Sequence, residues 1–418
     1  MRPSRPPGRL AALIALSVAV GLAPGASART GASGEAGSGP GTWRPSAGAA
    51  RVLAAESGVK WSDVGRNHWA RAAVDHVAGA NNWMRDFPEN KDGTYPFKPH
   101  KVEPRRLFAR AVVRALAPDE PTDPDLRFDD LPKSDRFWPY ANVAVKLGWM
   151  TRSAGKFLPD GDVTTRTVHR ALVLALGFRG IAADLDRLQT TDGKRFDTPR
   201  DFGTTLLGMR LGLRYNHSDE ALDVGPTTPL PRAEVAWSLY RAATIDPDYA
   251  TSATALYEDI ELPRLSDAKR RIVKFGVRYV GYPYVWGGEW EDRTPDGYCC
   301  GAQPVGGFDC SGWTWWIVKK AAGSWDNTPP RDYRGWTLAE RSSLDMSRTG
   351  DRIGWKGIKP GDLLFYDGSG DGKVDHVDVY IGNGWALDSS SGVGGVTIVN
   401  VAQGWYRDHF HHARRIIG

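Results

Sequence analysis

The chain has 418 residues, of which 41% are hydrophobic and 25% charged, with a formal net charge of +5 at pH 7. This length predicts two or more domains. Three of the positive charges lie in the first ten residues, so the remainder is close to neutral, and no run of Lys and Arg is present. The charge pattern therefore excludes a basic nucleic-acid-binding protein.

The chain opens with the pattern of a secretory signal peptide over residues 1–28. A basic start is followed by an apolar stretch over residues 10–23 and by the small residues Ala-Ser-Ala at 26–28, typical of a cleavage site. The apolar stretch is too short to span a bilayer, and no later stretch is long and uncharged enough to do so. We therefore expect a secreted protein without a transmembrane segment.

Residues 29–59 are rich in Gly, Ala, Ser and Pro and too poor in apolar side chains to form a core, which predicts a flexible linker. A pattern then repeats three times over residues 60–245, with units at about 60–125, 126–193 and 194–245. Each unit has a helical pattern, a loop and a second helix. Such units can bury their apolar faces only against one another, so we expect an all-α helical-repeat module.

The second helices are predicted over residues 105–116, 166–176 and 232–243. The repeats resemble the S-layer homology repeat in two motifs: the opening Trp-Ser-Asp-Val at 61–64, and Pro-Arg-Ala-Glu at 231–234, where the family has Thr-Arg-Ala-Glu. The resemblance implies a three-pronged module that binds cell-wall polysaccharide. A repeat architecture does not by itself specify a ligand, so a purely structural scaffold is the alternative.

Residues 246–266 form the predicted connection to a second domain at 267–418. In this domain the glycines before Cys310, and the helical pattern that follows Gly312, place Cys310 at a helix N-terminus. The helix dipole and the free backbone N–H groups there stabilise a thiolate. His376 begins an alternating apolar run that predicts a strand. Cys310 and His376 are thus the predicted nucleophile and base, against the alternative that Cys310 is a buried structural thiol.

A third polar group must orient the imidazole, and we choose Asp388 in the strand after residues 382–384. A three-residue loop at 382–384 would bring Asp388 opposite Asp378, on the face of His376. A two-residue turn would bring it opposite Val379, on the core face. We expect the first register. In the alternative, Asp388 is a solvated residue at a strand end and another group orients the imidazole.

Four motifs occur in order along this domain. They are Pro-Tyr-Val-Trp-Gly-Gly at 283–288, Phe-Asp-Cys-Ser-Gly at 308–312, Lys-Pro-Gly-Asp-Leu-Leu-Phe-Tyr at 359–366, and His-Val at 376–377. Together they resemble the NlpC-type cell-wall cysteine peptidases, a papain-like α+β family. The resemblance implies cleavage of peptidoglycan stem peptides, commonly between D-γ-glutamyl and the following diamino acid. The family usually has His as its third group, so Asp388 is a departure.

The same resemblance implies substrate-binding roles for three residues. Asp309 and Ser311 would hold the free amine of the stem peptide, and Tyr284 would line the site near the oxyanion. Simpler alternatives are an N-cap role for Asp309 or Ser311 and a half-buried strand position for Tyr284. No metal or cofactor is expected. Two other functions stay open: an amidase or acyltransferase with the same Cys-His chemistry, and a non-catalytic cell-wall-binding protein.

Three further features stand outside these motifs. Besides Cys310 the chain has only Cys299 and Cys300, which are either paired in a strained ring or both free. They lie in a long segment, 289–307, that is expected to shape the cleft. Residues 367–378 have the ligand spacing of a calcium loop, although Asp and Gly clusters are also ordinary turn residues. The histidines at 409–412 lack the partners of a zinc site and indicate a terminal strand.

Overall fold

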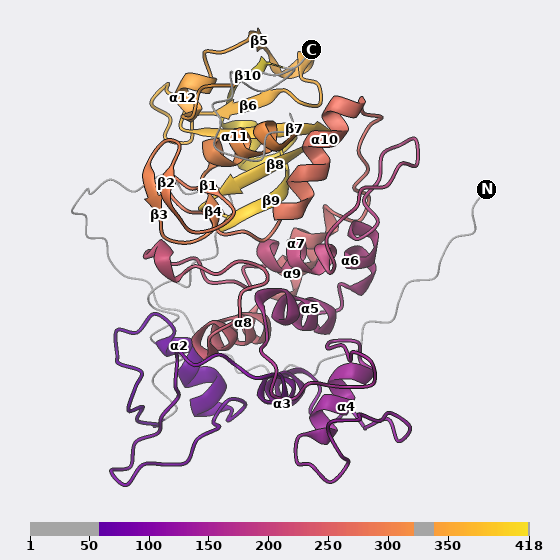
Figure 1. Ribbon diagram of the computed structural model, residues 1–418, viewed down its shortest axis with the longest axis vertical. Coiled ribbons are helices and arrows are strands. Elements are labelled where there is room, and N and C mark those ends of the chain that lie inside the picture. Colours follow the sequence, from indigo (N-terminus) through magenta and orange to yellow (C-terminus); the bar gives the residue numbers. More distant parts are fainter. Residues whose placement is uncertain (1–57, 322–337, 417–418) are drawn as a thin grey trace, which may run out of the picture. The chain divides into compact units, whose positions relative to one another are not determined.

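The computed structural model describes residues 58–321 and 338–416, which form a helical region and a C-terminal domain built on a sheet (Figure 1). The predicted signal peptide, and all but the last two residues of the predicted linker over 29–59, lie outside the described residues. Within the described part of the chain, no helix has the length and apolar character needed to cross a membrane.

The helical region agrees with the predicted all-α module. Its elements are α2 (Arg71–Val74), η1 (Asp75–Ala80), α3 (Arg105–Leu116), α4 (Trp138–Lys146), α5 (Thr165–Ala175), α6 (Arg179–Leu185), α7 (Phe202–Arg210), η2 (Glu220–Leu222), α8 (Arg232–Thr244) and α9 (Pro247–Ala255). The three predicted second helices correspond to α3, α5 and α8 within one residue at either end. The helix α6 has no counterpart among the predicted elements, and α9 lies in the predicted connection.

The first two units close their loops with the same hydrogen bonds. The carboxylate of Asp63 accepts hydrogen bonds from the backbone N–H groups of residues 97–98, both at 2.8 Å. Asp130 does the same for residues 157–158, also at 2.8 Å. In each loop the second residue has a left-handed backbone, with φ of 60° at Lys98 and 59° at Leu158. The two units therefore repeat in three dimensions as well as in sequence.

The second helices of the three units pack against one another, since α3, α5 and α8 contact each other pairwise. The backbone segments that lead into them are also joined, by bridges between residues 102 and 231 and between residues 164 and 229. Arg232 at the start of α8 is fully buried and forms an ion pair with Glu103 at 2.5 Å. Through these contacts the third unit closes back onto the first.

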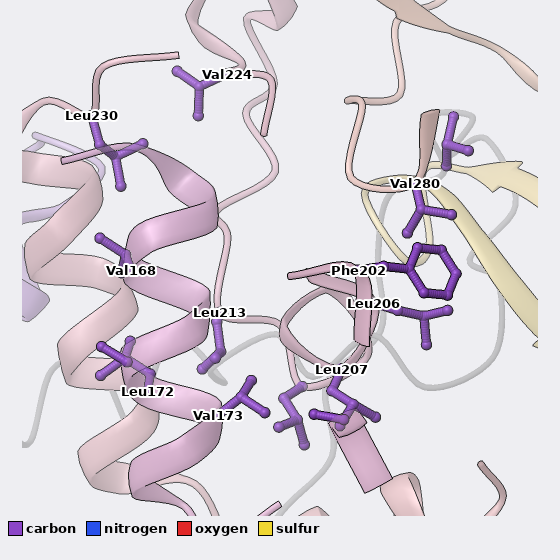
Figure 2. Close-up of a cluster of buried hydrophobic side chains, with 14 of the residues drawn as sticks. Val168, Leu172, Val173, Phe202, Leu206, Leu207, Leu213, Val224, Leu230 and Val280 are labelled. Atoms are coloured by element: carbon purple, nitrogen blue, oxygen red, sulfur yellow. The ribbon is translucent and has the colours of Figure 1, made fainter. Parts of the chain in front are cut away.

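A hydrophobic core surrounds α5 and α7 (Figure 2). Val168, Leu172 and Val173 project from α5, while Leu206 and Leu207 project from α7. All five side chains are fully buried. Val168 and Leu172 project from one side of α5 and Val173 from the side that faces α7, so α5 is apolar on more than one side, as expected for an enclosed helix.

The C-terminal domain has a six-stranded antiparallel sheet in the order β5-β10-β6-β7-β8-β9. Its strands are β5 (Asp351–Ile353), β6 (Leu363–Tyr366), β7 (His376–Gly382), β8 (Trp385–Ser390), β9 (Gly395–Asn400) and β10 (Phe410–Arg415). Two small hairpins pair β1 (Glu289–Trp290) with β4 (Gly307–Phe308) and β2 (Thr294–Gly297) with β3 (Gly301–Gln303). The remaining elements are α10 (Asp267–Gly276), η3 (Val277–Tyr279), α11 (Cys310–Ala321), α12 (Ser343–Met346), η5 (Trp355–Gly357) and α13 (Gly404–Asp408). The α+β architecture is as predicted.

Helix α11 packs against β7 and β8 and carries three buried tryptophans, Trp313, Trp315 and Trp316. A helix that is hydrophobic on several sides is stable only when it is enclosed. On β7, the residues predicted to face the core, Val377 among them, are at most 1% exposed. The packing of α11 against the sheet fixes the first residue of the helix relative to the first residue of β7.

The register between β7 and β8 agrees with the prediction, although the turn does not. Val379 pairs with Leu387, so Asp388 comes opposite Asp378. The connection is a two-residue turn, Asn383 and Gly384, with φ of 51° and 83°. A two-residue turn in a regular hairpin would instead bring Asp388 opposite Val379, on the core face. An irregularity between the pairs at Tyr380 and Gly382 shifts the pairing by one residue and restores the predicted one.

Candidate active site

Cys310 is the first residue of α11 and is 8% exposed. It is a free thiol, because the structure joins the other two cysteines, Cys299 and Cys300, to each other. Asp309 precedes it as the N-cap, and its carboxylate accepts a hydrogen bond from the backbone N–H of Gly312 at 2.6 Å. The sulfur therefore lies at the positive end of a well-capped helix, which stabilises a thiolate.

His376, the first residue of β7, faces two carboxylates. Its Nε2 lies 2.9 Å from Oδ1 of Asp388 and 3.2 Å from Oδ1 of Asp378. A hydrogen bond with Cys310 is among the interactions that raise the pKa of His376. Because Nε2 is turned to the carboxylates, Nδ1 is the nitrogen left for the thiol. The structure thus brings Cys310, His376 and Asp388 together in the order that nucleophile, base and orienting group require.

The electrostatics favour a charged imidazole. Burial by itself would lower the pKa of His376, but the negative charge held by the neighbouring carboxylate pair, Asp378 and Asp388, and hydrogen bonds with these residues and Cys310 raise that pKa well above its usual value. A histidine that keeps its proton at neutral pH can pair with a Cys310 thiolate. Such an ion pair is the reactive form of a cysteine nucleophile.

Asp388 is fully buried and well supplied with donors. The hydroxyl of Tyr406 donates to its Oδ2 at 2.8 Å and the hydroxyl of Ser390 to the same atom at 3.0 Å. Burial would raise the pKa of Asp388, yet hydrogen bonds, that of His376 first, hold it below its usual value. The group facing the imidazole is therefore an ionised carboxylate.

Tyr284, predicted to lie near the oxyanion, is half-buried beside the nucleophile. Burial raises the pKa of its hydroxyl far above the usual value, and the charges of Cys310 and Asp309 raise it further. The hydroxyl thus keeps its proton and can donate a hydrogen bond. The predicted role near the oxyanion stays a prediction.

Asp309 and Ser311 belong to a buried network centred on Arg341. The guanidinium Nη1 of Arg341 donates to Asp309 Oδ1 at 3.0 Å and to Ser311 Oγ at 2.8 Å, and its Nε donates to Glu289 at 2.6 Å. Asp309 thus acts as an N-cap, the simpler alternative to its expected substrate role, and it also pairs with Arg341. The substrate-amine role stays a prediction.

Three residues of the site were not predicted. Asp378 shares the face of His376, so strand alternation alone could have identified it. Arg341 lies 31 residues after the nucleophile without a motif, and Tyr406 on α13 is equally remote, so no sequence signal marks either. Their places are set by tertiary packing.

The segment 289–307 packs against α11 through β1, and its expected role in shaping the cleft stays a prediction. Cys300 lies against Gly287, where an added Cβ would come within 3.1 Å of its side chain. Tyr298 stacks on Trp315 of α11, with ring centroids 4.9 Å apart. Close by, Trp286 is 76% exposed, and its backbone N–H donates to Glu220 at 2.8 Å.

One group of side chains at the site has the composition of a cation site. Single ligand atoms of His376, Asp378 and Asp388 lie within 4.8 Å of one another, which is the spacing of a metal site. The Nε2 of His376 is however already hydrogen-bonded to Asp388, so we assign the group to acid–base chemistry. In the loop 367–378, which has the ligand spacing of a calcium loop, Asp367 and Asp375 accept hydrogen bonds from backbone N–H groups of their own loop. That arrangement is turn chemistry.

The NlpC/P60 family matches residues 281–415 of this chain. The bifunctional muramidase/DL-endopeptidase CwlT of Bacillus subtilis is 30% identical over 151 residues, 36% of this chain and 37% of that protein. A gamma-D-glutamyl-L-lysine dipeptidyl-peptidase of Bacillus cereus is 31% identical over 160 residues, 38% of each chain. An NlpC/P60 protein structure from Bacillus cereus aligns at 27% identity and a TM-score of 0.27, covering 38% of this chain and 42% of that one.

The chain spans less than two fifths of the length of these two curated relatives. The similarity bears out the NlpC-type resemblance predicted for the C-terminal domain. The family match does not reach residues 60–245, so the S-layer-homology resemblance stays a prediction.

Proposed function

Because residues 281–415 form an NlpC/P60 domain, we propose that the protein is a secreted cysteine endopeptidase that hydrolyses peptide bonds in peptidoglycan stem peptides. The bond we propose is that between D-γ-glutamyl and the following diamino acid. The curated relatives, whose names include a DL-endopeptidase and a γ-D-glutamyl-L-lysine dipeptidyl-peptidase, support this choice. The observation that carries it is the alignment of Cys310, His376 and Asp388.

In the proposed mechanism the thiolate of Cys310 attacks the carbonyl carbon of the scissile bond. The C–N bond then breaks, and Nδ1–H of His376 gives its proton to the departing amine. The thioester that remains is attacked by water, whose proton passes to His376. Release of the carboxylic acid regenerates the thiolate and the imidazolium. Asp388 stays ionised throughout and holds the ring.

The oxyanion that forms on the carbonyl needs donors. The N-terminus of α11 presents backbone N–H groups that have no partner within the helix. Tyr284 adds a protonated hydroxyl on the same side as Cys310. We propose that these groups together stabilise the tetrahedral intermediate.

Asp309 and Ser311 are proposed to bind the free amine of the stem peptide. Asp309 keeps an ionic partner in Arg341, so an incoming ammonium would join an existing network.

Residues 60–245 are proposed to hold the enzyme at the cell wall through wall polysaccharide. The repeated turns at Asp63 and Asp130, and the mutual packing of α3, α5 and α8, support a closed three-unit module. The test is sedimentation of the full chain carrying Cys310→Ala with purified walls, before and after chemical removal of the polysaccharide. Equal binding to both wall preparations would favour a scaffold.

Mass spectrometry of muropeptides tests the proposed activity. Wild type is expected to produce new stem fragments with free diamino-acid amines, whereas Cys310→Ala produces none. Replacing Cys299 and Cys300 by Ser is the matched control and leaves the fragments present. A new amide in the products would instead indicate an acyltransferase, and identical digests from wild type and Cys310→Ala would favour a non-catalytic wall-binding protein.

A further inference from the structure

A second carboxylate lies beside the catalytic imidazole and has no part in the mechanism above. Asp378 follows His376 by two residues on β7, and its side chain is fully buried. Its Oδ1 lies 3.2 Å from Nε2 of His376. None of its contacts with the described residues has the geometry of a regular hydrogen bond, and Nε2 of His376 lies closer to Asp388, at 2.9 Å. A buried charge left in this way is unfavourable.

Asp378 and Asp388 lie too close together for both to be charged. One oxygen of each and Nε2 of His376 lie within 4.8 Å of one another, and neither carboxylate is exposed to solvent. Two buried carboxylates at this separation repel each other, and a single imidazolium offsets only one of the charges. Carboxyl pairs in this situation hold one proton between them.

The surroundings decide which carboxylate keeps the proton. Asp388 accepts hydrogen bonds from His376, Tyr406 and Ser390, and each of these donors favours its ionised form. Asp378 shares only the same Nε2, at the longer distance of 3.2 Å, and no hydroxyl of the described residues donates to it with regular geometry. In agreement with this, burial and the charge of Asp388 raise the pKa of Asp378 well above its usual value.

We propose that Asp378 is a positioning residue that stays protonated in the resting enzyme and donates its proton to the carboxylate of Asp388. Asp388 then remains the single charge that faces the imidazolium. Its carboxylate is held by Asp378 as well as by Tyr406 and Ser390, which fixes the ring of His376 for proton transfer. The catalytic consequence rests on the proposed function, but the shared proton is a property of the resting protein.

The titratable groups that face Asp378 come from several elements. They are His376 on β7, Tyr366 on β6, Asp388 on β8 and Tyr406 on α13. Burial raises the pKa of the Tyr366 and Tyr406 hydroxyls well above their usual value, so both stay neutral. Among these groups, only the imidazole and the two carboxylates therefore exchange protons near neutral pH.

Infrared spectroscopy of the resting full-length protein tests the shared proton without substrate. At neutral pH the wild type is expected to show the C=O stretch of a buried protonated carboxyl group, and Asp378→Asn is expected to lack it. A wild-type spectrum without that band overturns the proposal. This measurement remains decisive even if the protein has no peptidase activity.

Substitutions at Asp378 and Asp388 test which of the two carboxyl groups carries the proton. The amide of Asp378→Asn keeps the size of the side chain and an N–H donor for Asp388, so we expect kcat within about threefold of wild type and an unchanged KM. Asp378→Ala removes the donor and is expected to lower kcat by about tenfold or more. Asp388→Asn removes the charge itself and is expected to lower kcat more than Asp378→Asn does.

The reverse order, with Asp378→Asn the more damaging of the two Asn variants, would mean that Asp378 carries the charge and would overturn the proposal. The rate at which iodoacetamide alkylates Cys310, followed against pH, gives the same comparison without a peptide substrate. Wild type and Asp378→Asn are expected to share one profile, because both keep the ionised Asp388 that sustains the thiolate–imidazolium pair. If Asp378→Ala does not fold, the comparison of Asp378→Asn with Asp388→Asn and the infrared band still show whether Asp378 carries the proton.

Discussion

Nε2 of His376 lies 2.9 Å from Oδ1 of Asp388, although the two residues belong to different strands and are separated by a turn. The contact exists because Val379 pairs with Leu387, which brings Asp388 onto the face of His376. The other ring nitrogen is thereby left for Cys310. A change of one residue in this register would turn Asp388 to the opposite face and leave the imidazole without its acceptor.

Replacing Asp388 tests its role as the orienting group. We expect Asp388→Ala to lower kcat by about a hundredfold or more with little change in KM, because the ring then loses both its orientation and its charge partner. Steady-state kinetics on a synthetic stem peptide measures this. Asp371→Ala, in the exposed loop before β7, is the matched control and should be neutral. A large rise in KM instead would assign Asp388 to substrate binding.

The pH dependence of activity follows from the raised pKa of His376. The active ion pair exists once the thiol has lost its proton and until the imidazolium loses its own. Since the pKa of His376 is raised above 6.5, the alkaline limb of kcat/KM should lie above that pH. Asp388→Asn removes an interaction that stabilises the imidazolium, so the limb should move to lower pH. If the alkaline limb of the Asp388→Asn profile stays at the wild-type pH, Asp388 does not control the imidazolium proton of His376.

Arg341 is expected to be required for the stability of the C-terminal domain. Arg341→Ala leaves the buried carboxylates of Glu289 and Asp309 without their cation, and losing one partner of a buried ion pair costs about 3–5 kcal/mol. Thermal unfolding of the full chain should show the transition of this domain at a lower temperature. Arg348→Ala, at an exposed ion pair, is the control and should shift it little. Equal shifts for the two variants would contradict the prediction.

The repeated turn in the helical region gives a prediction independent of the active site. Asp63→Ala leaves two backbone N–H groups of residues 97–98 without their acceptor and should destabilise the region by about 1–3 kcal/mol. Asp130→Ala should have a similar effect in the second unit. The exposed neighbour Asp129 is the control, since Asp129→Ala is expected to change stability by less than about 0.5 kcal/mol. Chemical denaturation followed by circular dichroism measures all three.

Much of this protein could be predicted because the signals are local. The helix that begins at Cys310 is marked by glycines before it and an uninterrupted helical pattern after it. The strand at His376 is marked by strict alternation, and the second helices of the repeats were predicted within one residue at either end. In each case the periodicity of apolar residues matches one type of secondary structure, so neighbouring residues alone determine the outcome.

The sequence by itself thus determined the order of the domains, the helix that carries the nucleophile and the strand that carries the base. Only the tertiary structure decided how the strand of Asp388 is aligned, because a two-residue turn predicts one register and the irregularity at Tyr380 imposes the other. It also decided that Arg341 pairs with Asp309 and that Asp378 lies beside a second carboxylate. Such contacts join residues distant in the chain, and their energies depend on burial and on partners that no local pattern specifies.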